Sequence, residues 1–293
     1  MKTKKRPGNT NTTFAVLSMV PSIAGVLIFF ILPFFTVVYY SAVDNPITHE
    51  FVGFENFKAL FGNKAFIAAA KNTAVLSLIT VPPAVVLSMV LAMLMESSIP
   101  AKSGFRSIFL SPVMVPAASV VLIWQVVFHY NGTLNSRLLE AFGAEPVDWL
   151  KSKYCLVVIA LLFLWKNLGY NMILYLSALA GMPKDLLEVA ELEGADPFYR
   201  FFHIKLRYLS PTIIFVTILS LINSFKLFRE VYLLTGDYPY EGLYLLQHYM
   251  NNTFRTLDYQ KLSSAAIVMM LIMIVIIGTL IHFDNKFGGD IEE

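Results

Sequence analysis

Polar side chains interrupt the long apolar run that ends near residue 234, and they could bind a ligand. Asn223, Lys226 and Glu230 follow one another at spacings of three and four residues, which places them on one face of a helix. Lys226 and Glu230 are predicted to pair with each other across one turn. Charged side chains are costly inside a membrane and usually face a cavity or a partner. This helix face is therefore predicted to form one wall of a polar cavity.

The preceding apolar run, at about residues 155–180, carries a second set of polar residues. Aromatic rings can cover the apolar C–H patches of a sugar, while amide and charged groups can bond its hydroxyls. The two sets of polar residues together predict a pathway for a sugar, and Asn171 and Asn223 are the residues most expected to contact it. The alternative is that these side chains join helices or, as for Arg229, reach toward the membrane surface. The residues predicted to line the pathway are Trp165, Asn167, Tyr170, Asn171, Asn223, Lys226 and Glu230.

The composition indicates that these residues sit in a membrane. The chain has 293 residues, of which 57% are hydrophobic and 14% are charged, whereas a soluble domain carries about 25% charged residues. Apolar stretches of roughly 20 residues are long enough to cross a bilayer as helices. Six such stretches lie at about residues 14–40, 73–95, 108–128, 155–180, 211–234 and 263–283. The sequence predicts an all-α membrane protein, with residues 1–293 forming one domain of six transmembrane helices.

Prolines lie inside two of these stretches. Pro82 and Pro83 fall in the second, and Pro112 and Pro116 fall in the third. Prolines at membrane depth are tolerated where neighbouring groups or a water-filled cavity satisfy the freed carbonyls. They therefore predict interrupted helices, which either line a translocation path or are kinked to tune packing.

The polar segment Gly181–Pro211 separates the fourth and fifth stretches and predicts two short helices. Gly194 tolerates the left-handed conformation that ends many helices. Asp196 can cap the second helix, and Pro197 suits its first position. An amphipathic helix pair of this kind at a membrane surface is typical of a docking element for another protein.

The same segment resembles a known family. Glu188-Val189-Ala190, then Glu193-Gly194-Ala195, then Ile204, Leu206 and Pro211 resemble the EAA loop of bacterial ABC-importer permeases. The closer resemblance is to carbohydrate-uptake permeases of the maltose and glycerol-phosphate type. The chain departs from the family pattern at Val189, Glu193 and Arg207, where the family usually has Ala, Asp and Pro.

The resemblance implies a function and a set of partners. The chain would be one permease half of an ATP-driven importer for a sugar or oligosaccharide, in a bacterial plasma membrane, working by alternating access. Its partners would be membrane lipid, a second related permease in a heterodimer, an ATPase dimer that holds ATP and Mg, an extracellular substrate-binding lipoprotein and the carbohydrate. The residues that would dock on the ATPase are Glu188, Val189, Ala190, Glu193, Gly194 and Ala195.

Positive charges predict the orientation, because cytoplasmic loops carry an excess of Lys and Arg. The amino terminus, the loop after the second stretch and the segment 181–211 are rich in them. Both termini and this segment are therefore predicted to be cytoplasmic. The cations that carry the prediction are Lys2, Lys4, Lys5, Arg6, Lys102, Arg106, Lys184, Arg200, Lys205, Arg207 and Lys286.

Several function classes find no support in the sequence. The chain has no GxxxxGK[ST] phosphate loop, so ATP hydrolysis is expected on a separate subunit, with no cofactor in this chain. Its five histidines lack metal-ligand spacing, so no metal site is expected, and Cys155 is its only cysteine. The net charge of +2 gives no reason to expect nucleic acid. No catalytic constellation stands out, so the chain is predicted not to be an enzyme.

Two alternative transport functions stay open at this point. A secondary transporter would need its own ion or proton site and usually has internal repeats, and neither is visible. A permease for a non-sugar solute such as glycerol phosphate would favour clustered arginines in the cavity, where only Arg229 is near.

Overall fold

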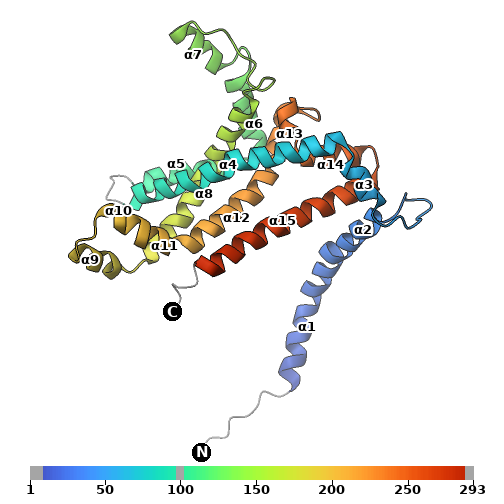
Figure 1. Cartoon of the computed structure of the whole chain (residues 1–293), viewed down its shortest axis with the longest axis horizontal. Coiled ribbons are helices and arrows are strands. Elements are labelled where there is room, and N and C mark those ends of the chain that lie inside the picture. Colours follow the sequence, from blue (N-terminus) through green and yellow to red (C-terminus); the bar gives the residue numbers. More distant parts are fainter. Residues whose placement is uncertain (1–8, 97–101, 288–293) are drawn as a thin grey trace, which may run out of the picture. The chain divides into compact units, whose positions relative to one another are not determined.

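The computed structural model describes residues 9–96 and 102–287, and it is helical, as predicted (Figure 1). Within these residues no β-strand forms, and the only bridge joins Val43 to Phe51. The described residues include five helices long and apolar enough to cross a membrane, or six if one bent pair is a single span. The cations Lys2, Lys4, Lys5 and Arg6 lie outside the described residues.

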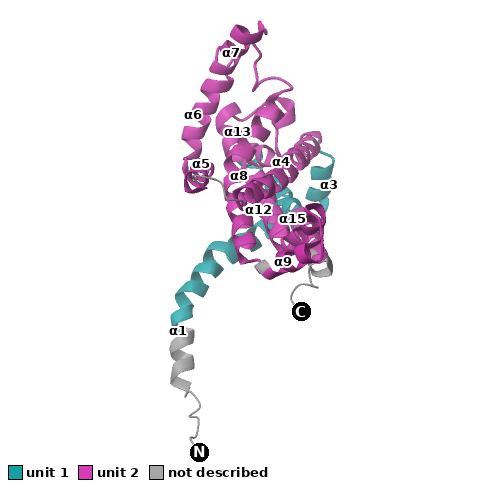
Figure 2. Cartoon of the chain, turned by 90° about the vertical axis from the view of Figure 1, so that its left-hand side faces the viewer, with its two compact units in different colours: residues 1–63, 253–271 teal, residues 64–252, 272–293 magenta. Residues whose placement is uncertain are grey.

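The contacts of the chain group into two compact units (Figure 2). The first comprises residues 1–63 and 253–271, and the second comprises residues 64–252 and 272–293. The helix α15 (Tyr259–Phe287) contributes to both. The prediction that residues 1–293 form one domain stays a prediction.

The first unit contains a long apolar helical run. It consists of α1 (Asn9–Val26), the π-helical turn η1 (Leu27–Ile31) and α2 (Leu32–Ser41), followed by the short helix α3 (Glu55–Phe61). Residues Leu17–Ser41 of this run form a candidate membrane span. An apolar helical run of this length suits contact with lipid or with other membrane helices.

Three long helices form the centre of the second unit. They are α4 (Lys64–Glu96), α8 (Cys155–Gly181) and α12 (Ser210–Lys226), and each packs against the other two. Phe163 and Ile159 lie in one buried cluster, and Tyr175 and Met172 lie in a second. Since all four come from α8, this helix runs through the core from end to end.

A helix from the third predicted stretch packs closely on α8. In α5 (Lys102–Met114), the carbonyl oxygen of Phe109 would lie 1.8 Å from a Cβ added at Gly169 of α8. No side chain fits at Gly169, because the opposing atom belongs to the backbone. The glycine therefore sets the distance between α5 and α8.

The third predicted stretch is not one helix. It divides into α5 and α6 (Ala117–Phe128), and the helical segments Lys102–Met114 and Ala117–Phe142 meet at 99°. Pro116 precedes α6 in an extended conformation (ψ 140°), which an uninterrupted helix cannot contain.

The predicted interruptions at Pro82, Pro83 and Pro112 are wrong, because α4 continues through the first two and α5 continues through the third. The fifth predicted stretch forms one candidate membrane span, Ser210–Thr235, in which α12 and α13 (Phe228–Thr235) join at Leu227. The remaining elements are α7 (Thr133–Phe142), α9 (Lys184–Leu192), α10 (Pro197–Tyr199), the π-helical η2 (Arg200–Lys205), α11 (Leu206–Tyr208), η3 (Glu241–Leu243) and α14 (Leu246–Arg255).

Candidate functional site

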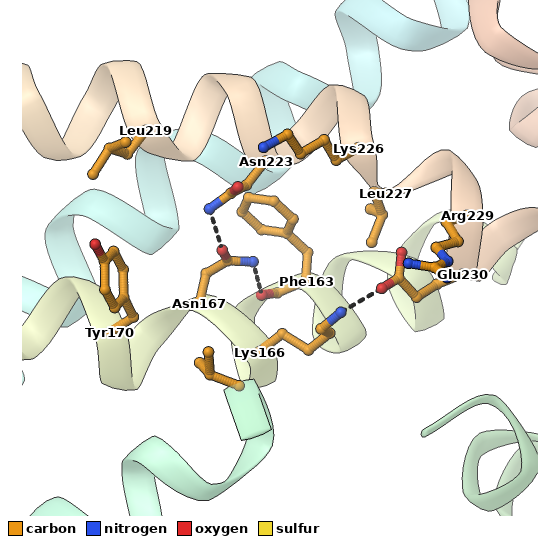
Figure 3. Close-up of a pocket in the computed structure, with 11 residues that line it drawn as sticks. Phe163, Lys166, Asn167, Tyr170, Leu219, Asn223, Lys226, Leu227, Arg229 and Glu230 are labelled. Atoms are coloured by element: carbon orange, nitrogen blue, oxygen red, sulfur yellow. Dashed lines mark hydrogen bonds and ion pairs between the residues drawn. The ribbon is translucent and has the colours of Figure 1, made fainter. Parts of the chain in front are cut away.

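A cavity of about 460 Å³ lies between α8 and the α12–α13 pair, with one residue from α5 (Figure 3). Its volume falls in the range of small-molecule sites. Amide, phenol and charged groups alternate with apolar side chains along its wall. The lining residues are Val113, Phe163, Lys166, Asn167, Tyr170, Leu219, Asn223, Lys226, Leu227, Arg229 and Glu230.

An ion pair crosses the cavity wall from α8 to α13. The Nζ of Lys166 donates to Oε1 of Glu230, whose side chain is only 7% exposed (Figure 3). The predicted pairing of Glu230 with Lys226 is wrong. At Leu227 the helix tightens, because the N–H of Glu230 donates to the Leu227 carbonyl three residues back. The Glu230 side chain therefore reaches Lys166 of α8 instead of Lys226.

Two amides link α8 to α12 at the same cavity. The Nδ2 of Asn223 donates to Oδ1 of Asn167 at 2.9 Å, and the Nδ2 of Asn167 donates to the Phe163 carbonyl at 2.8 Å (Figure 3). This chain of bonds orients both amides. It places groups that can bond hydroxyls beside the ring of Tyr170, which also lines the cavity.

Two of the seven predicted pathway residues do not line this cavity. Asn171 is fully buried, and its Nδ2 donates to Oγ of Ser220 at 2.9 Å, so it joins α8 to α12. Trp165 is 40% exposed, with its ring centroid 6.4 Å from that of Trp124. The other five, Asn167, Tyr170, Asn223, Lys226 and Glu230, all line it.

Sequence reasoning missed the apolar part of the wall. Leu219 lies one turn before Asn223 on α12, so the helical spacing that grouped the polar residues could have included it. Val113 carries no such signal, because its position depends on the contact between α5 and α8 at Gly169.

The segment 181–211, which we call the coupling segment, adopts the predicted local structure. Gly194 has φ +83°, and the N–H of Ala195 bonds the Ala190 carbonyl at 2.9 Å, which closes α9. Oδ1 of Asp196 accepts a bond from the Tyr199 N–H at 2.6 Å, and Pro197 occupies the first helical position. The cap and the glycine turn predicted from the sequence are both confirmed.

The surface of the coupling segment carries exposed apolar side chains. Leu192 is 88% exposed, Phe198 is 73% exposed and Val189 is 53% exposed. Glu188, Glu193 and Gly194 are also exposed, whereas Ala190 and Ala195 are half-buried. Four of the residues that the resemblance singled out are thus accessible, Glu188 and Val189 on α9 and Glu193 and Gly194 in the turn that follows it.

Ion pairs tie the coupling segment together and to α4. Arg200 pairs with Glu191 at 2.6 Å, and Lys205 pairs with Glu96, the last residue of α4, at 2.6 Å. At Arg207, where the related pattern has proline, the chain stays helical within α11. Because η2, α11 and α12 follow one another with only Leu209 between them, the segment continues almost directly into the cavity wall.

Comparison with known proteins identifies the class. Residues 84–284 match the model for the inner membrane component of binding-protein-dependent transport systems. The chain belongs to this family of membrane transport permeases, which confirms the resemblance to ABC-importer permeases.

Named relatives cover nearly the whole chain. The sulfoquinovosyl glycerol permease SmoG of Agrobacterium fabrum is 31% identical and covers 87% of this chain and 85% of its own length. The sn-glycerol-3-phosphate permease UgpA of Yersinia enterocolitica is 28% identical and covers 92% of this chain and 93% of its own length. The arabinooligosaccharide permease AraP of Halalkalibacterium halodurans is 27% identical and covers 94% of this chain and 85% of its own length.

A solved structure has the same fold. A chain of a bacterial ABC transporter involved in the import of the acidic polysaccharide alginate superposes with a TM-score of 0.83, at 21% identity, covering 94% of this chain and 96% of its own. A chain from the structure of a bacterial alginate ABC transporter in complex with an alginate pentasaccharide-bound periplasmic protein also superposes with a TM-score of 0.83, at 20% identity. The all-α permease fold predicted from the sequence is therefore confirmed.

Proposed function

We propose that this chain is one permease half of an ATP-driven importer for a sugar or oligosaccharide. The proposal rests mainly on how the chain connects two features. The exposed coupling segment lies between α8 and α12, and these two helices carry the amides that line the cavity. The named relatives support a sugar-like solute, since two of them carry a sugar derivative and an oligosaccharide.

The coupling segment would dock on a separate ATPase that binds ATP and Mg. Leu192 and Phe198 offer apolar area for such a contact, and Glu188 offers a charge beside it. Contiguous exposed apolar side chains rimmed by polar residues mark interaction sites. The residues proposed for this contact are Glu188, Val189, Ala190, Glu193, Gly194 and Ala195.

Movement of the docked segment would reach the cavity through rigid helices. The segment begins where α8 ends and leads into α12, and Asn167 of α8 bonds Asn223 of α12. A displacement of one helix against the other must break or shift this bond. Alternating access would then expose the two amides first to one side of the membrane and then to the other.

The remaining partners follow from the same class. A second, related permease would supply the other half of the pathway, and an extracellular binding lipoprotein would deliver the solute. Both termini and the coupling segment would be cytoplasmic in a bacterial plasma membrane. A secondary transporter is disfavoured, because the family is one of binding-protein-dependent systems.

The test is uptake by the complete importer in proteoliposomes, with the second permease, the ATPase and the binding protein. Leu192→Ser and Glu188→Ala should each lower ATP-driven uptake, Leu192→Ser by about ten-fold or more, as for a residue at the centre of an interface. The ATPase should also dissociate more easily from the Leu192→Ser complex.

Matched controls come from the exposed helix α7. Leu139→Ser and Glu140→Ala make the same changes there, where Leu139 is 51% exposed and the Glu140 side chain is 65% exposed. Both controls should transport like the unmodified protein. Uptake by this chain without any ATPase, or labelling of the coupling segment from outside intact cells, would refute the proposal.

A further inference from the structure

The cavity wall carries more positive than negative charge. Three cations line it, Lys166, Lys226 and Arg229, and within the described residues Glu230 is the only carboxylate that does. The ion pair between Lys166 and Glu230 neutralises one cation. Two positive charges are therefore left at the cavity.

In the part of the chain that the structure describes, neither of these two charges is neutralised. Among the residues that the structure describes, Lys226 and Arg229 have no hydrogen-bond or ion-pair partner, and both are exposed. Both lie within the candidate membrane span Ser210–Thr235. Cations at such positions usually face a partner, a water-filled cavity or a transported solute.

The uncharged part of the wall is suited to hydroxyl groups. Asn167 and Asn223 present amides, and Tyr170 presents an aromatic ring. The guanidinium of Arg229 has a planar fork that matches carboxylate, sulfonate and phosphate groups. One wall thus combines recognition of a sugar ring with recognition of an anionic group.

We infer that the solute of this cavity is an acidic sugar or an acidic oligosaccharide, whose anionic group lies against Lys226 and Arg229. The inference rests on the proposed function and adds the charge of the solute. A neutral sugar would leave two cations of the pathway without a counter-charge. A small inorganic anion would leave most of the 460 Å³ unfilled.

The charge of the cavity can be measured without knowing the natural solute. Val113 lines the cavity and is 48% exposed, so Val113→Cys places a thiol there. The native Cys155 is only 1% exposed and is expected to stay unreactive. In the full complex in neutral-lipid nanodiscs, the labelling rates of an anionic and a cationic methanethiosulfonate reagent are compared.

The expected result is a preference for the anionic reagent. The ratio of anionic to cationic rates at Val113→Cys should exceed that at Leu139→Cys of α7 by about ten-fold, because a charged cleft concentrates counter-ions. Adding Lys226→Gln and Arg229→Gln should remove the excess, whereas Arg229→Lys should keep it. Equal ratios at the two positions would overturn the inference.

Protection experiments identify the class of anion. Glucuronate, glucose 6-sulfate and glucose 6-phosphate are each compared with glucose at matched ionic strength. At least one acidic sugar should slow labelling of Val113→Cys more than glucose does, and the Gln variants should lose this difference. If glucose protects as well as all three, or if anionic lipid alone removes the rate preference, the inference fails. Labelling requires no ATP, so these outcomes are independent of whether ATP-driven uptake is observed.

Discussion

The cavity wall and the coupling segment place polar and apolar side chains in opposite ways. At the cavity, Asn167, Asn223 and Glu230 are held by bonds to other helices of the same chain. On the coupling segment, Leu192 and Phe198 are largely exposed. Interior side chains are explained by the fold of one chain, whereas contiguous exposed apolar side chains indicate contact with lipid or with a second molecule.

This contrast predicts that substitutions in the two regions fail differently. Changes in the helical core should lower stability and function together. Changes in the coupling segment should lower function while the fold persists. Four substitutions test the contrast, from the largest expected effect on stability to the smallest.

Gly169→Val should have the largest effect. The added side chain would overlap the Phe109 carbonyl, and neither backbone can move without separating α5 from α8. Overpacking of this kind costs about 3 kcal/mol or more. Thermal unfolding followed by fluorescence-detected size exclusion should show a marked loss of folded protein. Gly278→Ala, where an added Cβ meets nothing within 4 Å, should behave like the unmodified chain.

Glu230→Gln should follow, because it leaves Lys166 in a partly buried position without its carboxylate. Breaking a buried ion pair costs about 3 kcal/mol when one charge remains. The melting temperature should fall, and Lys166→Met in the same chain should recover most of it. If the double variant is as unstable as the sum of the two single variants, the pair is not coupled.

His248 predicts a pH dependence of the core. It is fully buried against the ring of Phe228, and its Nδ1 accepts a bond from the Leu245 N–H. Burial lowers the pKa of His248 to about 4, and the charge of Asp237 opposes this shift only in part.

The direction of the change in stability with pH follows from the protons that His248 binds in the folded and in the unfolded chain. Above the ordinary histidine pKa of 6.5, folded and unfolded chains both hold a neutral imidazole. As the pH falls from 6.5 to about 4, only the unfolded chain gains the proton, so up to about 3 kcal/mol of stability is lost. Melting temperatures measured across this range should fall less in His248→Gln.

Asp196→Ala should have the smallest effect on stability. It removes the cap of α10, which is worth about 1 kcal/mol locally. The melting temperature should barely change, because the segment lies outside the packed clusters, but trypsin should cleave at Arg200 faster and uptake should fall. Asp196→Asn keeps an acceptor and should restore both. A large drop in melting temperature would show that the segment is part of the core.

Local features of the chain were predictable from the sequence. Gly194, Asp196 and Pro197 act within a few residues of themselves, so their effect on the backbone does not depend on distant contacts. The apolar stretches predicted helices for a similar reason, because lipid leaves the backbone few other ways to bond. The prolines predicted interrupted helices, and this prediction is confirmed at Pro116, where the helical segments meet at 99°. It is wrong at Pro82 and Pro83, which lie within an unbroken α4, since a proline permits a break without requiring one.

The sequence by itself determined which helix faces are polar and where the coupling segment turns, because helical spacing and capping depend on neighbours along the chain. Only the tertiary structure decided which side chains meet. Glu230 pairs with Lys166, 64 positions away, and Asn171 bonds Ser220 in the core instead of lining the cavity. Partners across helices depend on how the helices pack, and that packing is set by close contacts such as the one at Gly169, which no local pattern records.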